Sequence, residues 1–90
     1  MTIPETDTVP VWPEGVLARY LTAGGATVDI TRGSGVDFTA TCLGCGDAQE
    51  CDHVSATCIG GPATALKANQ GAAREWAQAH AERCRALPRP

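Results

Sequence analysis

The sequence predicts an α+β fold, in which a small antiparallel sheet packs against one long C-terminal helix. Apolar and polar residues alternate over residues 26–31 and 36–42, as expected for strands with one buried face. Apolar residues then recur every three or four positions over residues 62–87, as in an amphipathic helix. With a shorter strand-like run at residues 16–22, the strands are expected to form a three-stranded meander.

Turn signals separate the three predicted strands. Gly24-Gly25 divides the first run from the second, and residues 32–35, with two glycines, divide the second from the third. Cys42 ends the third run in phase with its apolar face, so its sulfur is expected to point toward whatever covers the sheet. The residues expected to face inward are Val28, Ile30, Val36, Phe38, Ala40 and Cys42.

One domain is expected over residues 14–87. Residues 1–13 contain three prolines and predict a flexible arm, although Trp12 is expected to pack against the domain. Residues 88–90 form a short tail. Residues 47–61 show no clear period and predict an exposed, irregular excursion between the sheet and the helix.

The helix is expected to begin at Pro62, which suits a first turn, and to reach Leu87, because Pro88 cannot continue it. Gly71 weakens the middle by about 1 kcal/mol relative to alanine, so a start at Ala72 is the alternative. The predicted apolar stripe consists of Leu66, Ala73, Trp76, Ala77, His80, Cys84 and Leu87.

The composition leaves little material for a core. The 90 residues include two Trp, one Tyr and one Phe, and much of the apolar fraction is alanine. Domains this small often rely on a metal or on disulfides. Five cysteines are an odd number, and neither a leader pattern nor a membrane-length apolar run occurs, which predicts a cytoplasmic protein with reduced thiols. Metal ligation is therefore the first interpretation of the cysteines.

Two separate pairs of residues predict a zinc site. Cys42 and Cys45 form a Cys-x2-Cys turn at a strand end, where two glycines let the backbone bend around an ion. His80 and Cys84 are four residues apart and share a helix face. Three thiolates and one imidazole make a closed tetrahedral shell for one structural zinc ion. The alternative is that His80 and Cys84 are ordinary core residues of the apolar stripe.

A rival arrangement draws on the excursion. The spacing Cys42-x2-Cys45-x7-His53-x4-Cys58 is close to a zinc knuckle, although its loop is three residues longer and the helix pair stays unexplained. A third interpretation adds a second, partial metal site from Cys51, His53 and Cys58. Cys51 and Cys58 could also form a disulfide under oxidising conditions, or all three are plain exposed loop residues.

The Cys-x2-Cys pair followed by His80-x3-Cys84 on a helix resembles a ββα or treble-clef-related zinc finger with three Cys and one His. The stretches 18–31 and 74–88 are similar to small proteins of high-GC actinobacteria that are often encoded near mobile or phage-like elements. The resemblance covers most of residues 12–90. It implies zinc binding by the two outer pairs and no established activity. The excursion, with its extra cysteines and histidine, departs from the family pattern.

The predicted function is that of a protein-interaction or regulatory accessory module. The alternative is a nucleic-acid-binding zinc finger, because residues 62–90 carry a net charge of +3 against −6 for residues 1–61. The first half of the helix offers few base-reading side chains, however, and cations near a helix C-terminus are favoured in any case. The candidate partner or phosphate contacts are Lys67, Arg74, Arg83 and Arg85.

An enzyme is not expected. Four protein ligands leave a zinc ion no position for water, and no deaminase, phosphate-loop or nucleophile-elbow motif occurs. A thiol-based metal or redox sensor built on Cys51 and Cys58 is less favoured still. The acidic neighbours Glu50 and Asp52 should raise the thiol pKa, whereas sensing needs a low one.

Overall fold

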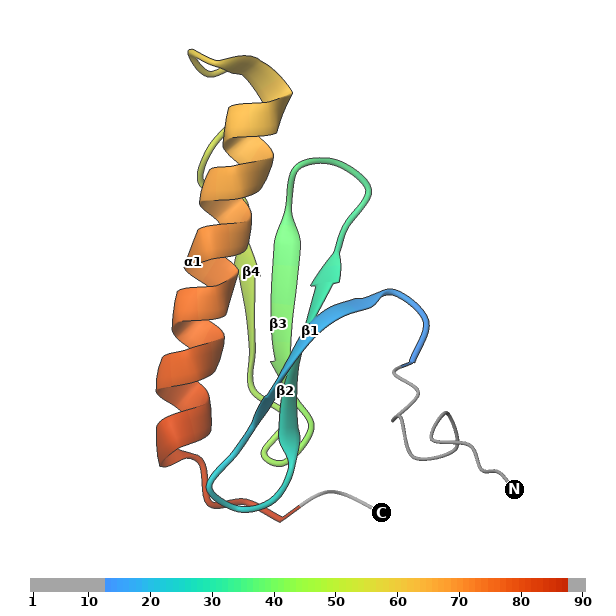
Figure 1. Cartoon of the computed structure of the whole chain (residues 1–90), viewed down its shortest axis with the longest axis vertical. Coiled ribbons are helices and arrows are strands. Elements are labelled where there is room, and N and C mark those ends of the chain that lie inside the picture. The colour runs from blue at the N-terminus through green and yellow to red at the C-terminus, as the bar shows by residue number, and fades with distance from the viewer. Residues whose placement is uncertain (1–12, 88–90) are drawn as a thin grey trace, which may run out of the picture.

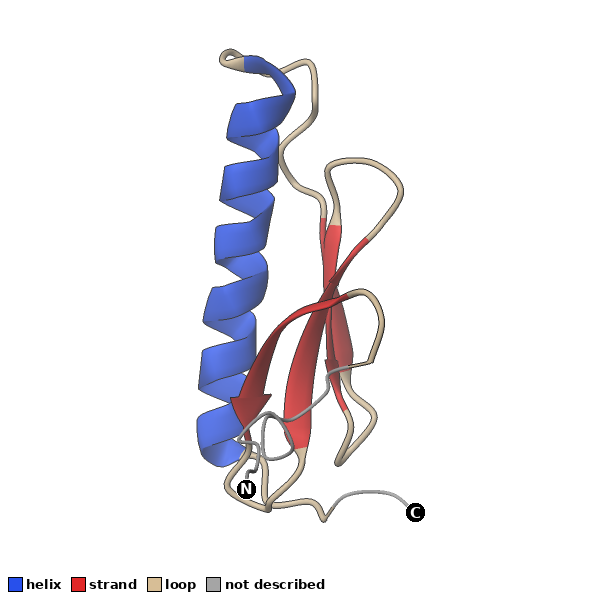
Figure 2. Ribbon diagram, turned by 45° about the vertical axis from the view of Figure 1, so that its right-hand side comes forward, coloured by secondary structure: helices blue, strands red, loops and turns tan. Residues whose placement is uncertain are grey.

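The computed structural model describes residues 13–87, which form a four-stranded sheet and one helix arranged in two layers (Figures 1 and 2). The elements in chain order are β1 (Val16–Leu21), β2 (Thr27–Arg32), β3 (Phe38–Cys42), β4 (Ala48–Cys51) and α1 (Gly61–Arg83). All neighbouring strands are antiparallel, in the order β1-β2-β3-β4. The α+β meander with a C-terminal helix is therefore confirmed. The predicted arm, the packing of Trp12 and the tail after residue 87 lie outside the described residues.

The fourth strand corrects the prediction of a three-stranded sheet and of an irregular excursion over residues 47–61. Ala48 to Cys51 pair with β3 in a register that joins Thr41 to Ala48 and Phe38 to Cys51. A run of four mixed residues is too short to show a strand period. It becomes a strand because β3 offers it a free edge, which is a tertiary effect.

The inward face of the sheet follows the predicted alternation. Val28 and Ile30 are fully buried on β2, and their register partners are Cys42 and Ala40 on β3. Cys42 is buried and lies at the end of β3, as predicted. Asp29 is also buried, on the opposite face, because Arg19 on β1 holds it with two hydrogen bonds of 2.8 Å.

The helix is longer at its start and shorter at its end than predicted. It begins at Gly61, so the alternative start at Ala72 is wrong, and Gly71 sits in open space on the helix surface. It ends at Arg83 rather than Leu87, because Cys84 adopts an extended conformation with φ −77° and ψ 118°. Leu87, predicted to lie on the buried stripe, is 75% exposed.

The buried side of α1 is narrower than the predicted stripe and is built mainly from small residues. Its buried positions recur every four residues and are Ala65, Asn69, Ala73, Ala77 and Ala81. Leu66, Trp76 and Cys84 pack against this core while only partly buried. Alanine side chains let the helix approach the sheet closely, and they bury little apolar area. The core is therefore thin, as the composition indicated.

Asn69 is the polar member of the buried helix face, and sequence analysis missed it. Its amide nitrogen donates hydrogen bonds to the carbonyls of Val36 and Val54, at 2.8 and 3.0 Å. Its side-chain oxygen accepts a bond of 3.1 Å from the Val54 N–H. One side chain thus joins the helix to the turn before β3 and to the chain after β4.

Candidate metal centre

The C-terminal end of α1 meets two turns of the sheet (Figure 1). The four predicted zinc ligands come together at this end. The ligand atoms of Cys42, Cys45, His80 and Cys84 all lie within 4.8 Å of one another. We call these four residues the tetrad. Within residues 13–87 it is the one group of three or more Cys, His, Asp or Glu side chains close enough to hold a metal ion.

Two distances inside the tetrad are close to the edges of a tetrahedral metal site. The sulfurs of Cys42 and Cys84 are 3.7 Å apart, and the Cys45 sulfur is 3.3 Å from Nε2 of His80. Zinc bond lengths of about 2.3 Å to sulfur and about 2.0 Å to nitrogen imply edges of about 3.8 Å between two sulfurs and about 3.5 Å between sulfur and nitrogen. The donor set and its spacing therefore fit one metal ion.

The turn between β3 and β4 presents the first two ligands. The Cys42 N–H donates to the Asp47 carbonyl at 2.7 Å, and the Gly46 N–H donates to the Cys42 carbonyl at 2.9 Å. Gly46 has φ +87°, a conformation that favours glycine and lets the chain turn back after Cys45. The Asp47 N–H also points at the Cys45 sulfur, at 3.5 Å. The backbone is thus folded around the two sulfurs.

Backbone N–H groups favour the thiolate at Cys42. Burial of this sulfur opposes ionisation, but hydrogen bonds from the N–H groups of Cys45 and Gly44, and then from the other two thiols, lower the pKa of Cys42 to about 7. At Cys45 the Asp47 N–H acts in the same direction, but desolvation and the neighbouring sulfurs of Cys42 and Cys84 outweigh it and raise the pKa. The first proton therefore leaves the buried thiol, and a cation would be needed to hold all the thiolates together.

The helix presents the other two ligands. Cys84 is the first residue past α1, and its N–H donates to the His80 carbonyl at 2.8 Å. The imidazole of His80 stacks on the indole of Trp76, with ring centroids 4.7 Å apart and an angle of 12° between the planes. This contact positions the imidazole. The spacing of four residues on one helix was the signal that could have predicted it.

The turn between β1 and β2 closes the site from the other side. The Ala23 N–H donates to the Ala81 carbonyl and the Gly24 N–H donates to the Cys84 carbonyl, both at 2.9 Å. A side chain at Gly24 would collide with the backbone of Arg85, only 2.4 Å away. Gly24, predicted only as a turn residue, therefore also allows the chain after α1 to lie against the sheet.

The remaining cysteines and His53 lie away from the tetrad. Cys51 is opposite Phe38 on β3, four residues before Cys42 and therefore roughly 13 Å along the strand. Its side chain belongs to the hydrophobic core, and burial, with a smaller contribution from Asp52, raises the pKa of the Cys51 thiol. Cys58 lies before α1, where its thiol donates to the Gly61 carbonyl at 3.6 Å. The structure thus joins Cys42 and Cys45 to the helix pair and not to His53 and Cys58.

The cations proposed as partner contacts are exposed but do not share one face. Lys67 and Arg74 are seven residues apart, about two helix turns, and therefore lie on the same side of α1. Arg83 is nine residues beyond Arg74, about half a turn out of phase, and Arg85 follows the helix. Arg74 also donates to the Tyr20 hydroxyl at 3.3 Å.

Within the described part of the chain, α1 is not apolar enough to cross a membrane.

Comparisons with protein-family models, with curated proteins and with solved structures find no match for this chain. The predicted resemblance to actinobacterial proteins therefore stays a prediction. What the residues support directly is a site of three cysteines and one histidine able to hold one metal ion.

Proposed function

We propose that this protein is a zinc-stapled module that presents a folded surface to a partner protein and has no catalytic activity. The observation that carries the proposal is the convergence of the four ligand atoms within 4.8 Å at the junction of the sheet and the helix. An ion there would clasp the β3–β4 turn to the end of α1, as in the ββα and treble-clef-related fingers that the sequence resembles.

Zinc is the ion that the donor set favours. Thiolate and imidazole ligands in tetrahedral array are typical of structural zinc sites, whereas magnesium and calcium prefer oxygen. Structural zinc contributes roughly 10 kcal/mol or more in finger-type peptides. A contribution of that size suits a domain whose helix buries mostly alanine. We expect one ion per chain.

The ligand count also supports a structural role over a catalytic one. Catalytic zinc usually has three protein ligands and keeps a fourth position for water or substrate. Three sulfurs and one nitrogen would fill a tetrahedral shell. The protein around the ion would then act by shape and surface rather than by activating water.

A protein partner fits the surface better than a nucleic acid. The exposed cations of α1 lie on opposite sides of the helix, with Lys67 and Arg74 on one side and Arg83 on the other. The exposed surface of the helix also carries the acids Glu75 and Glu82. A nucleic-acid interface needs several cations on one face, because each phosphate contact adds to the affinity. Salt-sensitive retardation of DNA or RNA by the zinc-loaded chain would contradict this part of the proposal.

Native mass spectrometry with and without chelator tests the staple. We expect one zinc ion per chain, lost together with the compact charge-state distribution. Cys84→Ser should lose the ion and the fold, whereas Cys58→Ser, which alters a thiol outside the tetrad, should keep both. A stoichiometry of two, or loss of the ion in Cys58→Ser, would contradict the proposed site.

A further inference from the structure

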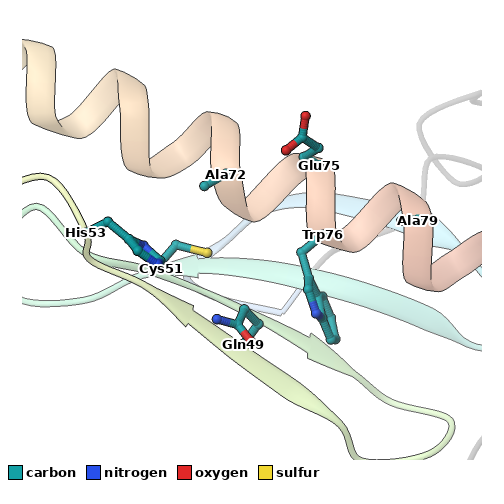
Figure 3. Close-up of a pocket in the computed structure, with 7 residues that line it drawn as sticks. All are labelled: Gln49, Cys51, His53, Ala72, Glu75, Trp76 and Ala79. Carbon is teal, nitrogen blue, oxygen red and sulfur yellow. The ribbon is translucent and has the colours of Figure 1, made fainter.

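A pocket of about 330 Å³ lies between β4 and α1, at the open edge of the sheet (Figure 3). β4 is the last strand of the sheet, and within residues 13–87 no strand pairs with its outer side. The lining residues are Gln49, Cys51, His53, Ala72, Glu75, Trp76 and Ala79. An unpaired strand edge and a side-chain pocket thus lie next to each other.

The register shows which backbone groups of β4 point away from β3. The Cys42 N–H donates to the Asp47 carbonyl at 2.7 Å, which sets the phase of the β3–β4 ladder. In an antiparallel ladder hydrogen-bonded pairs alternate, so Gln49 and Cys51 bond to β3 while the N–H and C=O groups of Ala48 and Glu50 point outward. The Glu50 carbonyl accepts a bond of 3.3 Å from the side-chain amide of its neighbour Gln49, which an added strand would replace. An added strand would find donors and acceptors at these two residues.

The pocket can take a side chain from such a strand. Small residues on the helix, Ala72 and Ala79, leave the space open, and the indole of Trp76 forms a wall (Figure 3). The buried Cys51 thiol lies on the opposite side, on β4. The volume of the pocket is at the lower end of the range for ligand pockets, which suits one aliphatic side chain better than a cofactor.

The charges around the edge select the partner. Glu50 and Asp52 are exposed on or beside β4, and Glu75 lies at the pocket. No lysine or arginine lines the pocket within residues 13–87. A second copy of this chain, pairing β4 with β4, would bring the like charges of Glu50 and Asp52 together, which is unfavourable. A basic strand would be attracted instead.

We propose that the outer edge of β4 and the adjoining pocket bind an extended, basic segment of a partner protein as a fifth strand. Apolar side chains on one face of that segment enter the pocket, while lysine or arginine side chains on its other face approach Glu50 and Asp52. This proposal rests on the interaction function given above and names the chemistry of the partner.

A synthetic peptide of sequence KVRLKVR, blocked at both ends, is the probe, and EVELEVE is its charge-reversed control. Titration of KVRLKVR into the zinc-loaded full chain should shift the amide resonances of β4 and of the helix residues at the pocket. Hydrogen exchange at the Ala48 and Glu50 amides should slow. EVELEVE should bind at least about tenfold more weakly, and added salt should weaken the binding of KVRLKVR.

Variants separate the backbone edge from the charge. Glu50→Pro removes an N–H that points away from β3, and it leaves the hydrogen bonds between β3 and β4 in place. The substitution should weaken the binding of KVRLKVR by about tenfold or more. Glu50→Gln, which keeps the N–H, should weaken it less. Ala79→Leu should fill the pocket and reduce binding, whereas Glu82→Gln, an exposed helix acid outside the pocket, should change nothing. Retention of zinc shows that each variant is folded.

The proposal is overturned if the peptide shifts resonances elsewhere, if EVELEVE binds equally well, or if Glu50→Pro binds like the parent chain. It is also overturned if sedimentation shows a dimer that Glu50→Pro dissociates, because a second copy would then occupy the edge. Zinc stoichiometry is measured separately. Failure of the peptide experiment with one zinc still bound would refute this edge alone, and loss of the zinc would refute the staple.

Discussion

The two ends of α1 are attached to the sheet by different chemistry. At the C-terminal end, the tetrad brings together four ligand atoms within 4.8 Å, and two backbone hydrogen bonds join α1 and Cys84 to the β1–β2 turn. Nearer the N-terminal end, Asn69 makes three hydrogen bonds to the backbone of Val36 and Val54. If the proposed staple is right, the first attachment depends on an ion and on the protonation of its thiols, whereas the second depends only on neutral groups. Solution conditions should therefore act mainly on the C-terminal end of α1.

Removal of zinc should have the largest effect. A structural zinc contribution of roughly 10 kcal/mol is comparable with the whole stability of a small domain, about 5–15 kcal/mol. We expect a chelator to abolish the cooperative thermal transition followed by circular dichroism, and added zinc to restore it. If the transition survives with the same midpoint, the Asn69 end and the core suffice by themselves and the comparison fails.

Lower pH should have the second largest effect, because it should weaken the attachment at the C-terminal end of α1. The pKa of Cys42 is about 7 in the folded chain against an ordinary 9.0, so its stabilising contribution is present above pH 9 and is lost as pH falls through about 7. Without metal, the raised pKa of Cys45 has the opposite effect on the pH dependence of stability. With zinc bound, every cysteine ligand is a thiolate, so protons compete with the ion at each of them. At fixed free zinc, affinity should therefore fall about tenfold per pH unit for each proton that competes.

Urea unfolding at fixed free zinc measures this dependence, and the midpoint should be lower at pH 6.5 than at pH 8.5. Cys58→Ser should show the same pH dependence as the parent chain, since Cys58 is not a ligand in the proposed site. A midpoint that rises as the pH falls would show that thiolates do not hold the sheet to the helix.

Loss of the side-chain amide of Asn69 should lower stability by a smaller amount, and this effect should not depend on zinc. Asn69→Ala would leave the Val54 N–H and the carbonyls of Val36 and Val54 without partners, and should lower the free energy of unfolding by about 3 kcal/mol. Urea unfolding of the zinc-loaded variant measures the loss. Gln78→Ala, at an exposed helix position, is the control and should change it by less than about 0.5 kcal/mol. If Asn69→Ala also lost zinc, the two ends would not be independent.

Two glycine substitutions should give the smallest effects, with opposite signs. Gly24→Ala places a methyl group 2.4 Å from the backbone of Arg85 and should cost about 1–3 kcal/mol. Gly71→Ala, in open space on the helix, should instead stabilise by up to about 1 kcal/mol. Thermal midpoints of the two zinc-loaded variants test this. Equal shifts would mean that the chain after α1 is not held closely against the β1–β2 turn.

Features that depend on local spacing could be predicted from the amino-acid sequence alone. The alternation around Val28 and Ile30 predicted the buried face, because a strand places every second side chain on one side. The spacings of Cys42 with Cys45 and of His80 with Cys84 predicted the four residues of the tetrad, because each pair lies within one turn or one helix face.

Other features follow from how the strands, the loops and the helix pack against one another in the folded chain. β4 forms because β3 offers an edge, and Cys51 is buried because that strand packs under α1. Asn69 is a core residue because two loops present backbone groups to it, and the helix ends at Arg83 because the next residues turn toward Gly24. The β3–β4 pairs are only 7 to 13 positions apart, but β4 is too short to show a strand period. The other contacts join residues many positions apart, for which neither periodicity nor motif spacing in the sequence carries a signal.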